Sequence, residues 1–184
     1  MLPDETILIQ RAQRGNQEAV TAIYDQYYPA VFTYIFYRVS NKTIAEDLTA
    51  EVFLRMIAKL PDFTGNGRPI LAWLYTIARN LVIDYYRNSK ERNTMPLEES
   101  LVAGEGGHPA KEMDDRLAQE CLSKALLGLT EEQRQVILLK FVDDREISEV
   151  SEIMGKNERA IRSLQHRALA ALHRAMGKER CYEF

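Results

Sequence analysis

Cysteine is scarce in this sequence, and long hydrophobic runs are absent. The chain of 184 residues has two cysteines, Cys121 and Cys181, which lie far apart and match no metal-binding or redox spacing. We therefore expect two reduced thiols rather than a disulfide framework. No apolar run approaches the roughly 18 residues that a membrane-spanning helix needs, and the N-terminus lacks the pattern of a signal peptide. These absences predict a soluble cytoplasmic protein with no direct membrane insertion.

Catalytic motifs are missing as well. The sequence has no Walker lysine motif, nucleophile elbow, HExxH motif or dinucleotide fingerprint. His166 and His173 could share one face of a helix, but no third metal ligand is evident near them. We expect no enzymatic activity, no metal, no cofactor and no small-molecule substrate. An enzyme is left only as an alternative whose mechanism the sequence does not display.

Positive charge is in deficit overall but concentrated in one place. The net charge of −3 and the isoelectric point of about 5.7 do not fit a general nucleic-acid coat protein. Residues 156–180 nevertheless hold seven Lys and Arg against two acids, whereas residues 143–152 hold five acids and one Arg. An ordinary solvated surface would not sort its charges in this way. The sequence therefore predicts a local basic patch that contacts DNA.

The hydrophobic periodicity is helical almost everywhere, and no alternating strand pattern is present. We expect Asp4 and Asn16 to cap the first two helices, and Pro29 to separate the second helix from a third. Thr130 and Gln133 are expected to form a capping box. The predicted helices cover residues 5–14, 17–27, 30–39, 44–60, 70–90, 111–129 and 131–142, followed by the pair described next. The fold class is therefore all-α.

The stretch 146–176 reads as two helices joined by a turn. Gly155 suits the end of the first helix, and Asn157 can cap the second. The second helix has an apolar stripe of Ile161, Leu164, Ala168 and Leu172, and an opposite face of Arg159, Arg162, Ser163 and His166. This pattern predicts a helix-turn-helix whose second helix enters the DNA major groove. A scaffold helix pair would show the same periodicity and is the alternative.

The segment 70–90 is apolar on more than one face. Its predicted core stripe comprises Ile70, Trp73, Leu74, Ile77 and Leu81, while Tyr75, Arg79, Ile83, Tyr86 and Arg87 project the other way. Exposed aromatic rings interleaved with Arg suit stacking on unpaired bases whose phosphates lie alongside. The alternative is that these rings pack against another helix or domain.

Residues 91–110 lose all periodicity and carry four acids and one Arg among several Gly and Pro residues. Such a composition predicts a flexible acidic linker. The expected organisation is two small helical domains, at residues 1–90 and 113–178, joined by a linker at 91–112 and followed by a tail at 179–184.

Four stretches of the chain share the patterns of a known family. IQRAQRGNQEAVTAIYDQYYPAVFTYIFYR is similar to the family's opening segment, and AEDLTAEVFLRMIAKL resembles a segment usually written D-L-x-Q-E-V-F. FTGNGRPILAWLYTIARNLVIDYYR matches W-L-x-x-I-A-R-N-x-x-x-D-x-x-R at every named position. LTEEQRQVILLKFVDDREISEVSEIMG and the following RSLQHRA match its C-terminal domain. The chain thus resembles the extracytoplasmic-function (ECF) sigma factors of bacterial RNA polymerase over almost its whole length.

For the first domain, called region 2 in this family, the resemblance implies two tasks. Asp47, Glu51 and Leu54 would contact the clamp helices of the polymerase β′ subunit. The residues that would handle the −10 element are Phe63, Arg68, Tyr75, Arg79, Asn80 and Arg87. Melting costs about 1.4 kcal/mol per stacking step, and capture of an extruded base in a loop pocket offsets part of this cost. Trp73 is expected in the core, and Asp84 is expected to anchor a buried Arg or a backbone amide.

For the second domain, called region 4, the resemblance implies that the recognition helix enters the major groove of the −35 element. The outward residues are Arg159, Arg162, Ser163 and His166, with Arg167 on the flank. The apolar segment VILLKF would meet the polymerase β flap. The resemblance further implies an anti-sigma factor as a partner.

The implied function is a promoter-specificity subunit that binds core RNA polymerase and promoter DNA without catalysis of its own. Ala160 and Leu164 stand where many relatives have Thr and Arg, so the −35 sequence is not predicted by resemblance. The alternative function is a stand-alone helix-turn-helix regulator that dimerises through Tyr75, Ile83 and Tyr86.

Overall fold

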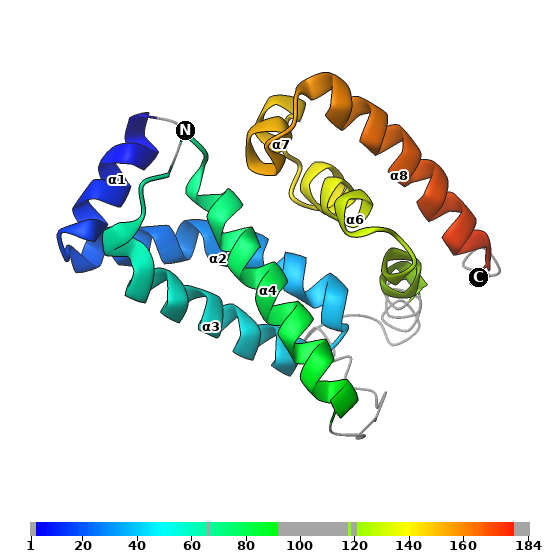
Figure 1. Ribbon diagram of the computed structural model, residues 1–184, viewed down its shortest axis with the longest axis horizontal. Helices are drawn as coiled ribbons and strands as arrows, with labels where there is room; N and C mark the ends of the chain where they lie inside the picture. The colour runs from blue at the N-terminus through cyan, green and yellow to red at the C-terminus, as the bar shows by residue number, and fades with distance from the viewer. Residues whose placement is uncertain (1–2, 66, 92–117, 119–120, 179–184) are drawn as a thin grey trace, which may run out of the picture.

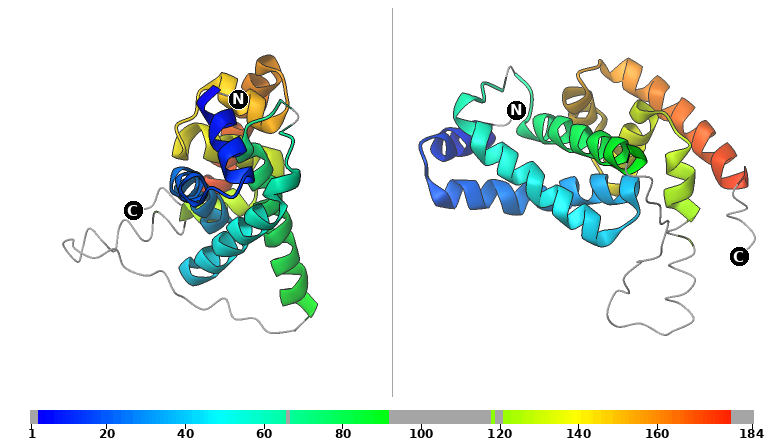
Figure 2. Two further views of the ribbon diagram at one scale, coloured as in Figure 1. Left: turned by 90° about the vertical axis from the view of Figure 1, so that its left-hand side faces the viewer. Right: turned by 60° about the horizontal axis from the view of Figure 1, so that its bottom comes forward.

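The computed structural model describes residues 3–65, 67–91, 118 and 121–178. All regular secondary structure within these residues is helical, as the sequence predicts. The helices form two groups, an N-terminal unit of α1–α4 and a C-terminal unit of residues 121–178 (Figure 1), and Figure 2 shows both groups from two further directions. The linker is predicted at 91–112, but residue 91 is the last of helix α4; residues 92–112 and the predicted tail at 179–184 lie outside the described residues.

The N-terminal unit is a helical bundle in which α2 contacts each of the other three helices. Its elements are α1 (Pro3–Gln13), α2 (Gln17–Val39), α3 (Lys42–Lys59), a short 3-10 helix η1 (Leu60–Asp62) and α4 (Ile70–Glu91). The side chain of Asn16 caps α2 by accepting a hydrogen bond from Ala19 N at 2.8 Å. Asn41 caps α3 in the same way, through Ile44 N at 3.0 Å.

Two predictions about this bundle are wrong. Asp4 lies inside α1 rather than before it, and α2 runs unbroken through Pro29. A proline in a helix interior costs about 3 kcal/mol. Tyr27, Val31 and Tyr34 are buried on both sides of this position, and burying each large side chain is favourable by about 1.5–3 kcal/mol. The packing of α2 therefore outweighs the local preference of Pro29.

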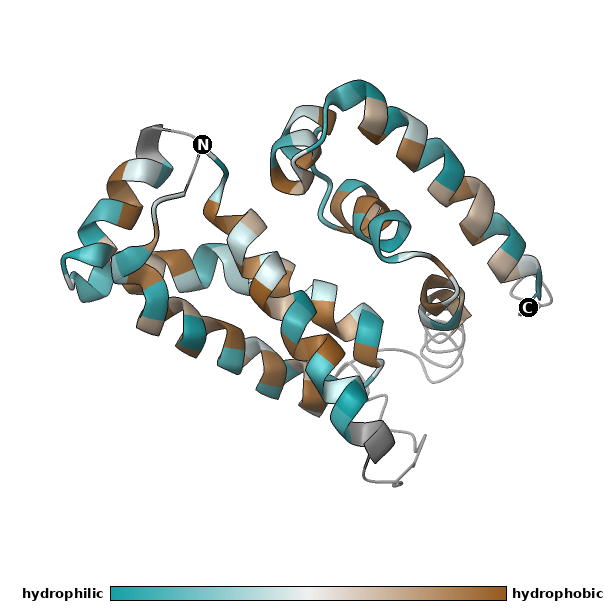
Figure 3. Cartoon of the chain, viewed as in Figure 1, coloured by the Kyte–Doolittle hydropathy of each residue, from teal (hydrophilic) through white to brown (hydrophobic). Residues whose placement is uncertain are grey.

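In the C-terminal unit, residues 121–127 form a helix. It continues with α6 (Glu131–Ile137), a π-helical segment η2 (Leu138–Val142), α7 (Ile147–Met154) and α8 (Glu158–Lys178). The predicted capping box is present: Thr130 Oγ1 accepts from Gln133 N at 3.3 Å, and Thr130 N donates to Gln133 Oε1 at 3.1 Å. Hydrophobic positions alternate with hydrophilic ones along α8 (Figure 3), and its hydrophobic side is buried in this unit.

The structure has Cys121 in a disulfide, so the prediction of two reduced thiols is wrong. Spacing along the chain does not report distance in space, which is why the sequence missed it. Cys181 is the other cysteine of the chain and lies outside the described residues. In the described part of the chain, no helix is long and apolar enough to cross a bilayer, and no cluster of His, Cys, Asp or Glu could hold a metal.

The two units are packed against each other through a contact that we call the unit interface. Its residues are Tyr34, Arg38 and Tyr75 of the N-terminal unit, and Glu131 and Asp143 of the C-terminal unit. Arg38 forms an ion pair with Glu131, and Tyr34 donates its hydroxyl hydrogen to the same carboxylate at 3.1 Å. Arg38 is only 1% exposed, and its guanidinium carbon lies 4.0 Å from the centre of the Tyr34 ring. Tyr75 is buried here, where the negative charge of Asp143 acts on its hydroxyl group.

Candidate nucleic-acid interface

α7 and α8 form the helix-turn-helix that the sequence predicts. α7 ends at Gly155, whose φ of 63° and ψ of 36° are left-handed, a conformation that suits glycine. The Asn157 side chain caps α8 by accepting a hydrogen bond from Ala160 N at 2.8 Å. Ile161 and Leu164 are buried on the inner face of α8, which confirms the predicted stripe at these positions. The helix-turn-helix follows from local caps and from the burial of this stripe.

The residues predicted to read the −35 element share the outer face of α8. Arg159, Arg162, Ser163, His166 and Arg167 are all exposed. Arg162 Nη2 lies 2.9 Å from Glu158 Oε2, one helical turn earlier. Exposed pairs of this spacing contribute only about 0.3–0.5 kcal/mol, so this pair leaves Arg162 able to turn toward a base or a phosphate.

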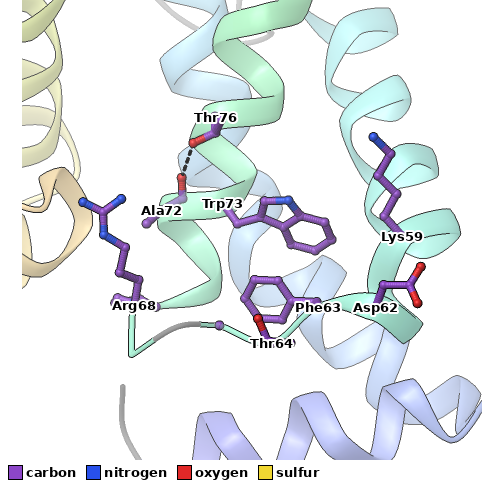
Figure 4. A pocket seen from close by; sticks show the side chains of 10 residues that line it. Lys59, Asp62, Phe63, Thr64, Arg68, Ala72, Trp73 and Thr76 are labelled. Atoms are coloured by element: carbon purple, nitrogen blue, oxygen red, sulfur yellow. Dashed lines mark hydrogen bonds between the residues drawn. The ribbon is translucent and has the colours of Figure 1, made fainter.

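A pocket opens on the N-terminal unit between η1, the loop at residues 63–69 and the start of α4 (Figure 4). Its volume is about 510 Å³, within the usual range of about 300–1,000 Å³ for small-molecule sites. Phe63 and Trp73 stack at its centre, with ring centroids 4.5 Å apart and planes inclined by 21°. The lining residues are Lys59, Asp62, Phe63, Thr64, Gly65, Arg68, Pro69, Ala72, Trp73 and Thr76.

Trp73 lies partly in the core, as the sequence predicts, and partly in the wall of the pocket. The sequence predicts it in the core, because it shares a helical stripe with Leu74 and Ile77. In the structure Leu74 and Ile77 are buried, whereas Trp73 is half-buried and lines the pocket. The loop at residues 63–69 folds back so that Phe63 covers one face of the indole. The aromatic pocket is therefore a product of this loop and of α4 together.

Arg68 does not turn toward the two rings. In Figure 4 its guanidinium points away from Phe63 and Trp73. It lies instead against the turn after α7, because a Cβ atom added at Gly155 would be 1.4 Å from Arg68 Nη2. The partial negative charge at the C-terminus of a helix favours a cation in this place.

Further along α4, the predicted base-handling residues are divided between the surface and the interior. Arg79, Asn80 and Arg87 are exposed, as a DNA contact requires. Arg87 Nη2 lies 3.0 Å from Asp84 Oδ1 at the surface. Asp84 therefore pairs with an exposed Arg rather than with the buried Arg or backbone amide that was predicted.

Tyr75 is 3% exposed, so the prediction that it projects from α4 into solvent is wrong. Its ring centroid lies 4.6 Å from that of Tyr34, and its hydroxyl is close enough to Asp143 of the other unit to feel the charge of that carboxylate. Burial raises the pKa of Tyr75 well above its usual value, and the charge of Asp143 adds to this shift. The alternative that its ring packs against the other domain is therefore correct for Tyr75. A dimer surface made of Tyr75, Ile83 and Tyr86 is not available in this arrangement.

The residues predicted to bind core polymerase lie on α3. Asp47 is exposed, Glu51 is half-buried, and Leu54 is 62% exposed. Ile57 on α3 and Tyr24 on α2 are also exposed large hydrophobic residues. Sequence reasoning missed these two. Ile57 is three residues beyond Leu54, and this helical spacing is the signal that could have found it.

The segment VILLKF, predicted to meet the β flap, lies mostly in the core. Its first four residues, at positions 136–139, are buried, whereas Phe141 is 52% exposed and Val142 beside it is also exposed. A flap contact by this part of the chain would therefore depend on Phe141 and Val142.

Comparison with known proteins identifies the class. The Sigma-70 region 2 model matches residues 23–92, and the Sigma-70, region 4 model matches residues 119–172. These two regions define a sigma-70-type subunit of RNA polymerase. The chain is 41% identical over 170 residues to the ECF RNA polymerase sigma factor BldN of Streptomyces coelicolor. This match covers 92% of the chain and 64% of BldN, so the chain spans about two thirds of that relative.

Solved structures agree in fold. CnrH, in its complex with the cytosolic domain of CnrY, has a TM-score of 0.69 and 22% identity, with 95% of this chain and 97% of CnrH covered. The sigma factor RpoE of Bartonella quintana, in complex with the anti-sigma factor NepR, has a TM-score of 0.60 and 22% identity, with 85% and 96% covered. The chain belongs to the ECF sigma factors, a family of non-enzymatic proteins that direct promoter recognition by RNA polymerase.

Proposed function

We propose that this chain binds core RNA polymerase and starts transcription at promoters that it reads at two points. α8 would read the −35 element, and the pocket around Phe63 and Trp73 would capture a base of the −10 element. The observation that carries the proposal is that one chain presents both an exposed basic recognition helix and an aromatic pocket on a separate unit.

The outer face of α8 suits base reading. An Arg can bind guanine through two hydrogen bonds in the major groove, which gives about 1–3 kcal/mol of discrimination. Arg159, Arg162, Ser163 and His166 would make these contacts near the start of the helix. Arg167 and Arg174 would hold phosphates, which position the protein and make its binding depend on salt.

The pocket suits an unstacked base. Stacking of a base on an aromatic side chain is worth about 1–3 kcal/mol, comparable to the roughly 1.4 kcal/mol that one melted step costs. Capture of one base by Phe63 and Trp73 would thus offset about one step of melting. Lys59 and Asp62 also line the pocket and would supply a donor and an acceptor for the edge of that base. Arg79, Asn80, Arg87 and, after it leaves α7, Arg68 would hold the non-template strand.

The remaining surfaces suit protein partners. Asp47, Glu51 and Leu54 on α3 would dock on the β′ clamp helices, and Phe141 with Val142 on the β flap. An anti-sigma factor is a further partner that we propose, supported by the complex of RpoE with NepR. These partners require the chain to act in the cytoplasm.

Run-off transcription with purified core polymerase tests the proposal. We expect promoter-specific transcripts only when this protein is added, and weak binding of the free protein to duplex promoter DNA. Transcription that never depends on the protein would exclude the sigma function. A tight dimer that binds duplex DNA without polymerase, seen by analytical ultracentrifugation and gel shift, would instead support the stand-alone regulator.

Replacing Phe63 tests the pocket separately. Phe63→Ala should weaken binding of the holoenzyme to a single-stranded −10 oligonucleotide by about tenfold, because one stacking contact is lost. The same variant should bind an oligonucleotide with an abasic site at the captured position as well as the wild type does. Leu127→Ala, which alters an exposed apolar side chain of the C-terminal unit, should leave both affinities unchanged. Equal losses on both oligonucleotides would contradict the pocket.

A further inference from the structure

The loop that carries Phe63 is held at its start by α1, a helix whose residues do not line the aromatic pocket. Gln13, the last residue of α1, donates from Nε2 to the carbonyl oxygens of Leu60 at 3.0 Å and of Phe63 at 2.7 Å. A side-chain amide nitrogen has two hydrogens, so Gln13 can satisfy both carbonyls at once. The backbone of Phe63 is thereby fixed beside the ring that stacks on Trp73.

The other end of the loop is also held by α1. Glu5 Oε1 accepts a hydrogen bond from Ile70 N, the first amide of α4, at 2.9 Å. The first amides of a helix have no partner within it, and a carboxylate is favoured at this end by the helix dipole. The hydroxyl of buried Tyr27 donates to the same Glu5 oxygen at 3.1 Å and fixes the carboxylate in place. Glu5 therefore sets where α4, and with it Trp73, begins.

External anchors matter for this loop because glycine gives it freedom. Gly65 and Gly67 have φ values of 70° and 76°, a region that glycine enters easily and other residues rarely. A glycine-containing loop samples many conformations unless contacts outside it select one. α1 itself is firmly placed, since Ile9 and Ala12 are buried in the core between Glu5 and Gln13.

We propose that Gln13 and Glu5 are positioning residues for the −10 pocket: by holding both ends of the loop, they keep Phe63 stacked on Trp73 and the pocket ready for a base. This inference rests on the proposed function of the pocket. It assigns to α1 a role in promoter opening without any contact with DNA. Residues 3–13 lie outside the stretch that matches Sigma-70 region 2, so this role belongs to a part of the chain that the family match does not cover.

The first test needs neither DNA nor polymerase. Trp73 is the only tryptophan of the chain, so its fluorescence reports on the pocket alone. Gln13→Met keeps the length of the side chain but removes its donors. We expect this variant to increase acrylamide quenching of Trp73 and to shift its emission to the red, because Phe63 no longer covers the indole. Gln26→Met is the matched control: Gln26 is exposed on α2 and does not line the aromatic pocket, so this change should leave the fluorescence unchanged.

The second test uses the holoenzyme. The affinity ratio between the ordinary −10 oligonucleotide and its abasic counterpart measures base capture. Gln13→Met should reduce this ratio by about tenfold, corresponding to the loss of two hydrogen bonds, while binding to core polymerase stays unchanged. Gln13→Lys, which restores donors for the same carbonyls, should recover much of the ratio. Glu5→Gln, which keeps an acceptor for Ile70 N, should lose less than Glu5→Ala.

The results of these tests distinguish failure of the proposed pocket from failure of the positioning role of α1. A wild-type protein that does not distinguish the two oligonucleotides would contradict the proposed pocket, and with it this role for α1. A wild-type protein that does distinguish them, with Gln13→Met unchanged in both fluorescence and ratio, would contradict the positioning role alone. If Gln13→Met lowers thermal stability and core binding as much as it lowers the ratio, and Gln13→Lys does not recover the ratio, Gln13 is only structural and the proposal fails.

Discussion

Two polar side chains of the N-terminal unit, Arg38 and Tyr75, are buried and find their partners in the C-terminal unit. Buried polar groups are costly unless they are hydrogen-bonded. Arg38 forms an ion pair with Glu131, and the hydroxyl of Tyr75 interacts with the charge of Asp143. Each residue is therefore buried by the other unit. The helical pattern of α4 alone does not include that unit, so it places Tyr75 on an exposed face.

Replacing Tyr75 by Phe gives a pH-dependent prediction. The pKa of Tyr75 is raised in the folded protein, so its contribution to stability is fully present below the unfolded value of about 10 and is lost as pH rises above it. Tyr75→Phe should lower the free energy of unfolding at neutral pH by about 0.5–1.5 kcal/mol, because the polar interaction of the Tyr75 hydroxyl with Asp143 is lost. The free energy of unfolding of Tyr75→Phe should also fall less steeply at high pH than that of the wild type.

Urea denaturation at about pH 8 and about pH 11, on either side of the unfolded pKa, measures both effects. Tyr24→Phe, at a half-exposed tyrosine away from the unit interface, serves as the control. Its free energy of unfolding should fall with pH as that of the wild type does. The same slope for Tyr75→Phe and the wild type would contradict the prediction.

At the scale of single elements, the turn between α7 and α8 has two reasons to contain glycine. Gly155 has φ 63°, and a side chain there would meet the guanidinium of Arg68. The sequence indicated the first reason through the position of Gly155 at a helix end. The second reason comes from a residue of the other unit and has no local signature.

Gly155→Ala should destabilise the protein by about 1–2 kcal/mol, the cost of a left-handed conformation with a side chain. Gly177→Ala is the matched control, because Gly177 lies in α8 with no neighbouring atoms near its Cβ position. That change should be neutral or stabilising, by up to about 0.5–1 kcal/mol. Thermal unfolding of both variants, and of Gly155→Ala combined with Arg68→Ala, separates backbone strain from the Arg68 contact. Equal melting temperatures for Gly155→Ala and Gly177→Ala would contradict this account.

At the scale of the whole molecule, the proposed reading of two promoter elements conflicts with the unit interface. The −35 and −10 positions are about 25 base pairs apart, or about 85 Å at roughly 3.4 Å per pair. Hydrogen bonds from Tyr34 and Arg38 to Glu131 hold the units in direct contact. On the proposed function, the units must therefore separate when the chain joins core polymerase and DNA.

Glu131→Gln should favour separation of the units, since it leaves the charge of Arg38 buried without its counter-ion. We expect a larger radius of gyration in small-angle X-ray scattering. Glu132→Gln removes the neighbouring carboxylate, which lies 2.9 Å from Lys156 within the same unit, and should leave the radius unchanged. The same radius for Glu131→Gln and Glu132→Gln would show that the ion pair does not hold the units together.

The sequence by itself determined what depends on neighbours within a few positions. Asn16, Asn157 and the pair of Thr130 and Gln133 cap helices as predicted, because capping joins residues three positions apart. The burial of Leu164 followed from helical periodicity, and the helix-turn-helix and its exposed basic face followed with it.

Tertiary structure alone decided which residues meet across long stretches of chain. It carried α2 through Pro29, turned Trp73 toward Phe63 and buried Tyr75 against Asp143. It also brought Gln13 to a loop 50 residues away. No periodic pattern records such contacts, because they arise from how whole helices pack after their local shapes are set.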